Sequence, residues 1–185
     1  MKKQDIINLL PIETEQLSLR LATLADATLI QNAKESRDVA LLRRWMSWSS
    51  DEGMSMQGTI DYLTRAESDA RIIALLAVDK VMRRHVLSTG LDAEDDDFNT
   101  ISTGWWLSYG HEGKGLAYEG MSALIDFCKV NHVCKTLTSC HYEGNERSQL
   151  LMERLGFQYV RTQPKAHQCH LNREMVDVLD YELKI

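Results

Sequence analysis

The sequence predicts a single domain of the α/β (or α+β) class built around a mixed β-sheet. With 185 residues, of which 44% are hydrophobic and 26% charged, the chain has the composition of a globular protein and is long enough to bury a sizeable core. Helical and strand-like patterns are intermingled, and no internal repeat, low-complexity tract or Pro/Gly-rich linker divides them. We expect residues 1–14 to be a frayed N-terminal leader and residues 15–185 to form the domain.

The first half of the domain is expected to contain one strand and three helices. Apolar and polar residues alternate over Glu15–Leu21, which is the period of a half-buried strand. Thr23 is a plausible N-cap, and Asp26 follows three residues later as in a capping box. Two further helical stretches are expected at Leu41–Trp48 and at about Met56–Ser68.

The second half changes to strands. Three apolar runs with short links, at residues 72–78, 85–93 and 100–107, predict an antiparallel meander. The pattern then predicts a helix (Ala117–Asn131), a strand (Lys135–Tyr142), a helix (Glu146–Leu155) that ends at Gly156, and two closing strands near Phe157–Gln163 and Val176–Leu183.

Charge and composition exclude several classes of function. The net charge of −6 argues against broad, non-specific binding to nucleic acid. No run approaches 18 apolar residues, and the first residues lack the apolar region of a signal peptide, so we expect a cytoplasmic protein without a membrane span. The four cysteines form no C-x-x-C pair and are expected to be reduced and mostly buried. A zinc site from His167, Cys169 and His170 would lack a second ligand cluster, so no metal is expected.

The segment Glu112–Ala117 carries two glycines at the point where a strand passes into a helix. A tight turn exposes consecutive backbone amides, and the helix that follows adds the positive end of its dipole, so the segment suits a phosphate group. It is not a Walker A loop, because Lys114 is followed by Gly115 instead of serine or threonine. A plain tight turn before a helix is the alternative.

Downstream motifs give this loop a context. Asn145 and Ser148 begin a short helix that ends before Leu155-Gly156-Phe157. In this order the motifs resemble the GNAT N-acetyltransferase superfamily, whose acyl-CoA pyrophosphate loop reads Gln/Arg-x-x-Gly-x-Gly/Ala; Glu112 departs from the first position. A narrower resemblance, over residues 15–185, is to the ribosomal-protein N-terminal acetyltransferases of the RimJ/RimL branch. The residues that support it are Leu17–Arg20, Asp26–Ala27, Leu42–Trp48, Gly104–Leu107, Glu119–Gly120 and Asp177–Leu183.

The resemblance implies a sheet that splays after the meander, helices on both faces, and transfer of an acetyl group from acetyl-CoA to a primary amine by direct attack. It also implies which residues bind coenzyme A. They are Trp106, Leu107 and Ser108 on the strand, Glu112, Gly113, Lys114, Gly115, Leu116 and Ala117 in the loop, and Asn145.

Two catalytic roles follow from the same resemblance. Ser148 is the candidate acid for the leaving thiolate, because Met152 stands where many members have a tyrosine; the alternative is that Ser148 is only a residue of a first helical turn. The base is less determined, since Cys169 stands near the place of the glutamate expected in the branch. His170 or His167 could substitute, with Glu174 and Asp177 as lesser candidates.

Trp45 and Trp48 are three residues apart and would share one helix face, either in the core or, as the resemblance implies, beside the acceptor groove. The acceptor implied is a protein N-terminal amine of the ribosomal-protein type, bound by a monomer or a homodimer. A small-molecule amine, such as an amino acid, an antibiotic or a polyamine, is the first alternative. A non-catalytic module that binds CoA is the second.

Overall fold

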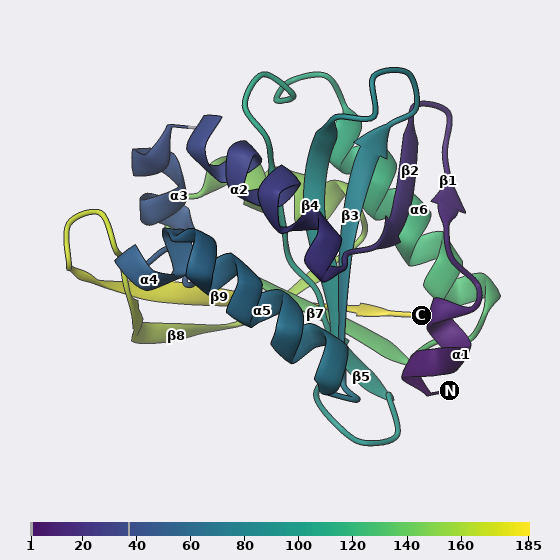
Figure 1. Cartoon of the computed structure of the whole chain (residues 1–185). Coiled ribbons are helices and arrows are strands. Elements are labelled where there is room, and N and C mark those ends of the chain that lie inside the picture. Colours follow the sequence, from purple (N-terminus) through teal and green to yellow (C-terminus); the bar gives the residue numbers. More distant parts are fainter. Residues whose placement is uncertain (1, 37) are drawn as a thin grey trace.

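The computed structural model describes residues 2–36 and 38–185, and it arranges them as a nine-stranded mixed sheet with helices on both faces (Figure 1). The strand order is β1-β2-β3-β4-β5-β7-β9-β8, and β6 pairs with β4. The strands are β1 (Ile12–Glu13), β2 (Leu17–Leu21), β3 (Ile72–Asp79), β4 (His85–Ala93), β5 (Thr100–Ser102), β6 (Trp105–Leu107), β7 (Thr136–Tyr142), β8 (Gln158–Gln168) and β9 (Met175–Lys184). The helices are α1 (Lys3–Ile7), α2 (Ala27–Ser36), α3 (Val39–Trp45), α4 (Asp51–Met54), α5 (Met56–Ser68), α6 (Leu116–Val130) and α7 (Glu146–Arg154), with a 3-10 turn at Leu24–Asp26.

The predicted mixed α/β fold is confirmed, including the meander. Strands β3, β4 and β5 follow one another in antiparallel pairs, and β2 extends them on the β3 side. The parallel pairing of β5 with β7 is made possible by α6, which crosses over between them. Strands β7, β9 and β8 then form a second antiparallel group, whose hairpin projects at the left of Figure 1.

Two apolar clusters fix the helices on the sheet. On one face α6 packs its buried side chains, among them Met121 and Leu124, on β2, β3 and β4. On the other face α2, α3 and α5 pack on the opposite side of β3, and this cluster includes Trp106. Gly120 lets α6 approach closely, because a Cβ there would lie 2.9 Å from Leu87 Cδ2. This packing fixes the position of the N-terminus of α6.

The first residues differ from the expected frayed leader. They include α1, and the side chain of Ile6 is fully buried in the core. Lys3 Nζ donates hydrogen bonds to the carbonyls of Glu67 (3.0 Å), in the last turn of α5, and Asp69 (2.8 Å), its C-cap residue. A helix of five residues is too short to show a period in the sequence.

Two expected elements are interrupted. The single strand expected at residues 100–107 is divided into β5 and β6 at Thr103-Gly104. The helix expected to run through Trp48 ends at Trp45, since the next residue, Met46, is extended. Serine hydroxyls compete for the backbone here: Ser49 Oγ donates to the Met46 carbonyl at 2.6 Å. Trp45 and Trp48 therefore do not share a helix face.

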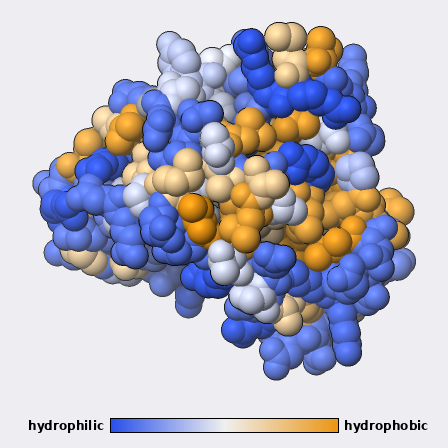
Figure 2. Space-filling view, in the orientation of Figure 1, coloured by the Kyte–Doolittle hydropathy of each residue, from blue (hydrophilic) through white to orange (hydrophobic). Residues whose placement is uncertain are grey.

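Hydropathy varies across the face of the molecule that is seen in the orientation of Figure 1. Apolar side chains gather over its middle and right, whereas largely hydrophilic side chains cover the end that carries the β8–β9 hairpin and α4 (Figure 2). In the part of the chain that the structure describes, no helix is both long enough and apolar enough to cross a bilayer.

Candidate functional site

The sheet opens where β6 diverges from β7. The last backbone hydrogen bond that joins the β5–β6 segment to β7 runs from Thr103 N–H to the Thr138 carbonyl (2.9 Å). Beyond it β6 pairs with β4, while β7 pairs with β9, so no strand of residues 2–36 or 38–185 lies between them. Ser139, the next residue of β7, has a buried hydroxyl with no hydrogen-bond partner among the described residues. A polar ligand atom in this opening would satisfy such a group.

Strand β6 turns one of its edges to β4 and the other to the opening. Ser108 N–H donates to the Val86 carbonyl (2.9 Å), and Trp106 lies opposite Ser88. Backbone groups alternate along an antiparallel ladder, so those of Trp106 and Ser108 face β4. The backbone groups of Trp105 and Leu107 therefore face the opening, and of the three strand residues expected to contact the ligand only Leu107 has this orientation.

His85 holds β6 against β4. Its Nδ1 lies 2.5 Å from Ser108 Oγ, its Nε2 lies 2.8 Å from Ser88 Oγ, and its ring stacks on Trp106 with 5.1 Å between ring centroids. Burial, helped by the nearby His111, lowers the pKa of His85 to about 4, against the opposing influence of Asp26. The imidazole is therefore neutral at physiological pH and acts as a hydrogen-bonded brace for the strand.

Acidification is expected to destabilise the protein through His85. The pKa is lower in the folded state, so the unfolded chain binds the proton first, and stability is lost as the pH falls from about 6.5 towards 4. Between pH 7.5 and 5 the wild type should lose about 2 kcal/mol more of its free energy of unfolding than His85→Gln, as measured by urea denaturation. The same substitution at the exposed His132 is the control. An equal loss in wild type and His85→Gln would contradict the prediction.

The glycine loop has the backbone geometry that an anion site requires. Gly113 and Gly115 have φ values of 73° and 78°, and a Cβ on either would meet nothing within 4 Å. Gly115 is the N-cap of α6, where no side chain caps the first free amides. Gly113, Lys114 and Gly115 are exposed, so the amides and the positive end of the helix dipole are accessible to a phosphate group.

Glu112 is compatible with an anion in this loop. Its side chain turns back along the chain, and Oε2 accepts a hydrogen bond from Gly110 N–H at 3.0 Å. This hydrogen bond holds the carboxylate at Gly110, on the side of the loop that precedes the glycines. Its repulsion of a phosphate bound at the loop amides is reduced for that reason.

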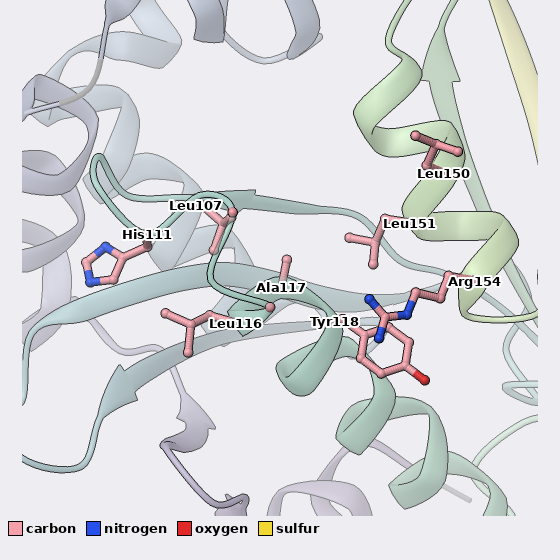
Figure 3. Close-up of a pocket in the computed structure, with 10 residues that line it drawn as sticks. Leu107, His111, Leu116, Ala117, Tyr118, Leu150, Leu151 and Arg154 are labelled. Carbon is pink, nitrogen blue, oxygen red and sulfur yellow. The ribbon is translucent and has the colours of Figure 1, made fainter.

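A cavity of about 230 Å³ lies between this loop and α7. In Figure 3 Leu151 points from α7 towards Ala117, and the guanidinium of Arg154 lies on the ring of Tyr118. Several residues that line the cavity have no role predicted from the sequence. These are His111, Tyr118, Leu150, Leu151 and Arg154. A signal for two of them was available, since Leu150 and Arg154 are four residues apart and share one face of a helix.

The expected residues of α7 meet at its start. Asn145 is buried and caps the helix: its Oδ1 accepts from Ser148 N–H at 3.3 Å. Ser148 is half-buried in the first turn, and Met152, one turn later, is buried in the core. The cap orients the first turn of α7 but does not by itself distinguish a catalytic Ser148 from a structural one.

A second cavity, of about 370 Å³, lies at the end of β7. Trp45 forms one wall, close to Gly144, where a Cβ would lie 3.9 Å from the indole. Glu143 and Glu174 also line it. Trp48 lies elsewhere, against Trp106 at 5.8 Å between ring centroids. Of the two tryptophans expected at the acceptor groove, Trp45 lines this cavity, whereas Trp48 is half-buried and packs against the apolar cluster that contains Trp106.

The histidines of the β8–β9 hairpin are turned to other partners. His170 Nε2–H donates to the Ser47 carbonyl at 2.8 Å, which leaves the lone pair on Nδ1, a buried atom with no partner among the described residues. His167 Nδ1 lies 3.4 Å from Tyr142 Oη, and Asp177 Oδ1 accepts from Lys165 N–H at 2.8 Å. His167, His170 and Asp177 line neither of the two cavities. Residues 2–36 and 38–185 contain no group of three His, Cys, Asp or Glu side chains that could hold a metal ion.

Together these parts suit one elongated ligand. The loop amides and Lys114 fit a diphosphate, the edge of β6 fits an extended chain with amide groups, and the cavity beside α7 offers apolar walls. The second cavity lies at the end of β7 and is lined by the carboxylates of Glu143 and Glu174, which suit a cationic group, and by Arg44, whose guanidinium lies over the Trp45 ring.

Comparison with known proteins supports this interpretation. Residues 16–158 match the family described as "Acetyltransferase (GNAT) domain". No curated protein matches the sequence. Among solved structures, the chain is similar to RimL, a ribosomal L7/L12 alpha-N-protein acetyltransferase in complex with coenzyme A, with a TM-score of 0.83, 17% identity, and 95% and 97% of the two chains covered.

Two further structures resemble the fold to a similar degree. One is the ribosomal-protein-S5-alanine acetyltransferase from Vibrio fischeri, with a TM-score of 0.80, 19% identity, and 95% and 96% of the chains covered. The other is the microcin C7 self-immunity acetyltransferase MccE in complex with acetyl-CoA and AMP, with a TM-score of 0.79, 18% identity, and 92% and 93% covered. At these identities the likeness shows a shared fold.

Proposed function

Because the chain belongs to the GNAT acetyltransferase family, we propose that it transfers the acetyl group of acetyl-CoA to the N-terminal amine of a protein, of the ribosomal-protein type. Membership of the family makes the chain an acetyl-CoA-dependent acyltransferase. The acceptor and the roles of individual residues in binding and catalysis are what we propose. The observation that carries it is the opening between β6 and β7, with the glycine loop after β6 and the second cavity at the end of β7. A ribosomal-protein acceptor would place the reaction in the cytoplasm.

The donor's binding site is assembled from three segments. The amides of Gly113 to Ala117 and the N-terminus of α6 would bind the diphosphate, with Lys114 beside it. The edge of β6 that faces the opening would pair with the amides of the pantetheine arm, and Asn145 would close the site at α7. Trp106 and Ser108 support this edge through His85.

The chemistry needs a neutral amine and a proton for the departing sulfur. The amine nitrogen attacks the thioester carbonyl, so a C–N bond forms and the C–S bond breaks, and coenzyme A leaves as the thiolate. Ser148 is the proposed acid, donating its hydroxyl proton to the sulfur directly or through a water that resupplies it. The proton lost by the ammonium group goes to a base in the acceptor cavity.

For that base, geometry favours Glu174 over His170. Glu174 lines the acceptor cavity, and Asn172 Nδ2 donates to its Oε2 at 2.6 Å, which orients the carboxylate. His170 is turned to Ser47, where its hydrogen bond holds the β8–β9 hairpin on the segment after α3. We assign His170 a positioning role and Glu174 the proton transfer.

The acceptor cavity favours a chain terminus. It is open, with exposed Glu143 and Glu174 and the indole of Trp45 as an apolar wall. Carboxylates attract the ammonium group of a peptide before it is deprotonated, and the open side leaves space for the rest of the chain. A cavity of about 370 Å³ would also admit a small amine, which is the alternative to be tested.

The test is a screen for acetyl-CoA-dependent release of free CoA. Ribosomal-protein N-terminal peptides should be turned over with higher kcat/KM than free amino acids, aminoglycosides or polyamines. A preference for one of the small amines would replace the proposed acceptor class. If calorimetry detected no binding of acetyl-CoA, both enzymatic proposals would fall together; binding of acetyl-CoA without turnover of any amine would favour the non-catalytic module that binds CoA.

Replacing the proposed base separates the two hairpin residues. Glu174→Gln is expected to lower kcat by about 10-fold and to abolish the acid limb of the pH–rate profile, with KM for acetyl-CoA unchanged. Glu182→Gln, which makes the same charge change at the far end of β9, is the control. If His170→Ala, and not Glu174→Gln, removed that limb, the assignment of the base would be reversed.

A further inference from the structure

Arg154 occupies an unusual position at the rim of the first cavity. It is the last residue of α7, and its guanidinium carbon lies 3.9 Å from the centroid of the Tyr118 ring, as Figure 3 shows. Stacking of this kind holds the planar group flat on the ring and leaves its N–H groups at the edge directed outwards. The cation is therefore pre-oriented before any ligand arrives.

Arg154 carries a charge that no other described residue neutralises. Among the described residues no carboxylate lies within ion-pair distance of it, although Arg20, Arg43 and Arg161 each have such a partner. The cavity that it borders is lined mainly by apolar side chains and the glycine loop, with His111 as the other ionisable side chain besides Tyr118, and no carboxylate of the described residues lines it. An arginine in this setting suits a phosphate group, which accepts two N–H bonds from one guanidinium.

The position of Arg154 relative to the glycine loop defines a second anion subsite. Tyr118 lies only three residues after Gly115, in the first turn of α6, so the stacked guanidinium and the loop amides border the same cavity. Leu150 and Leu151 form its α7 wall, and Leu150 is 65% exposed, so an apolar surface is accessible beside the guanidinium. A diphosphate on the loop, a base on the leucines and a second phosphate on Arg154 would belong to one nucleotide.

We propose that Arg154, held on Tyr118, binds the 3′-phosphate of the adenosine of acyl-CoA and so makes the enzyme selective for donors that carry this phosphate. The inference rests on the proposed binding of acetyl-CoA at the glycine loop. Arg154 would then select the donor from the C-terminal end of α7, whereas the acetyl group is transferred near the start of that helix.

The experiment compares two donors on two proteins. Acetyl-CoA and 3′-dephospho-acetyl-CoA are each titrated against wild type and Arg154→Gln, with KM and kcat as readouts. For wild type, KM should be about 10-fold lower with acetyl-CoA than with the dephospho donor, since hydrogen bonds between charged groups at a partly exposed site contribute on this scale. Arg154→Gln should raise KM for acetyl-CoA to the value of the dephospho donor, leave KM for the dephospho donor unchanged, and leave kcat unchanged with both.

The comparison of donors separates recognition from a structural role. Arg154 also lies at the negative end of the α7 dipole, so its loss could disturb α7. A structural effect would raise KM for both donors equally, and this result would overturn the proposal, as would a wild type that does not distinguish the donors. Lys129→Gln, an exposed cation in the last turn of α6, controls for a general loss of positive charge. A wild type that binds neither donor would instead refute the proposed function.

Discussion

Replacing Ser148 by alanine is expected to lower kcat by about 100-fold while KM for acetyl-CoA stays within about two-fold of the wild-type value. The reason is that the leaving thiolate needs a proton only as the C–S bond breaks. An interaction made only in the transition state affects kcat and not ground-state binding. Steady-state kinetics with saturating amine measures both quantities.

The surroundings of Ser148 support this assignment. Met152, one turn later in α7, is buried and has no proton to give, so α7 lacks the donor that a tyrosine would provide there. Asn145 caps the same turn through Ser148 N–H and so orients the backbone that carries this serine. Ser148 is half-buried, so its side chain is not enclosed in the core as that of Met152 is.

A matched substitution tests whether any change in this turn would have the same effect. Gln149 is the next residue, and its side chain pairs with Glu153 on the helix surface at 2.9 Å, so Gln149→Ala should leave kcat near the wild-type value. An undiminished kcat in Ser148→Ala would remove Ser148 from the mechanism and leave it as a residue of a first helical turn.

The apolar pattern predicted the elements whose burial is clear from the local sequence. Met56–Ser68 is helical at the expected bounds, and the runs at residues 72–78 and 85–93 form neighbouring antiparallel strands. The helix buries one face only and shows a helical period, whereas β3 is covered by helices on both faces and shows a continuous apolar run. The meander and the position of α6 could be predicted for that reason.

The features that shape the site could not be predicted in the same way. The break between β5 and β6 at Thr103-Gly104 results from pairing with different partners, since β5 joins both β4 and β7 whereas β6 joins β4 alone. A local pattern contains no information about which distant strand supplies the hydrogen bonds. The Arg154–Tyr118 contact and the turn of His170 towards Ser47 likewise join segments far apart in the sequence.

Glycine at position 115 is expected to be essential for binding of the donor. Gly115→Val should lower kcat/KM for acetyl-CoA by roughly 30-fold or more, mainly through KM, because a β-branched residue held at φ 78° costs about 1–3 kcal/mol and will move the amides that bind the diphosphate. Calorimetry with acetyl-CoA and steady-state kinetics measure the loss. Steric exclusion is not the cause, since a Cβ at this position meets nothing within 4 Å.

Two controls distinguish backbone conformation from side-chain size. Gly115→Asn should retain more activity than Gly115→Val, because asparagine tolerates the left-handed region at lower cost. Gly104 has equal space around it and lies outside the positive-φ region, so Gly104→Ala should leave the free energy of unfolding nearly unchanged. If valine and asparagine at position 115 bound acetyl-CoA as tightly as glycine, the orientation of these amides would not determine the affinity. The loop would then be only a tight turn before a helix.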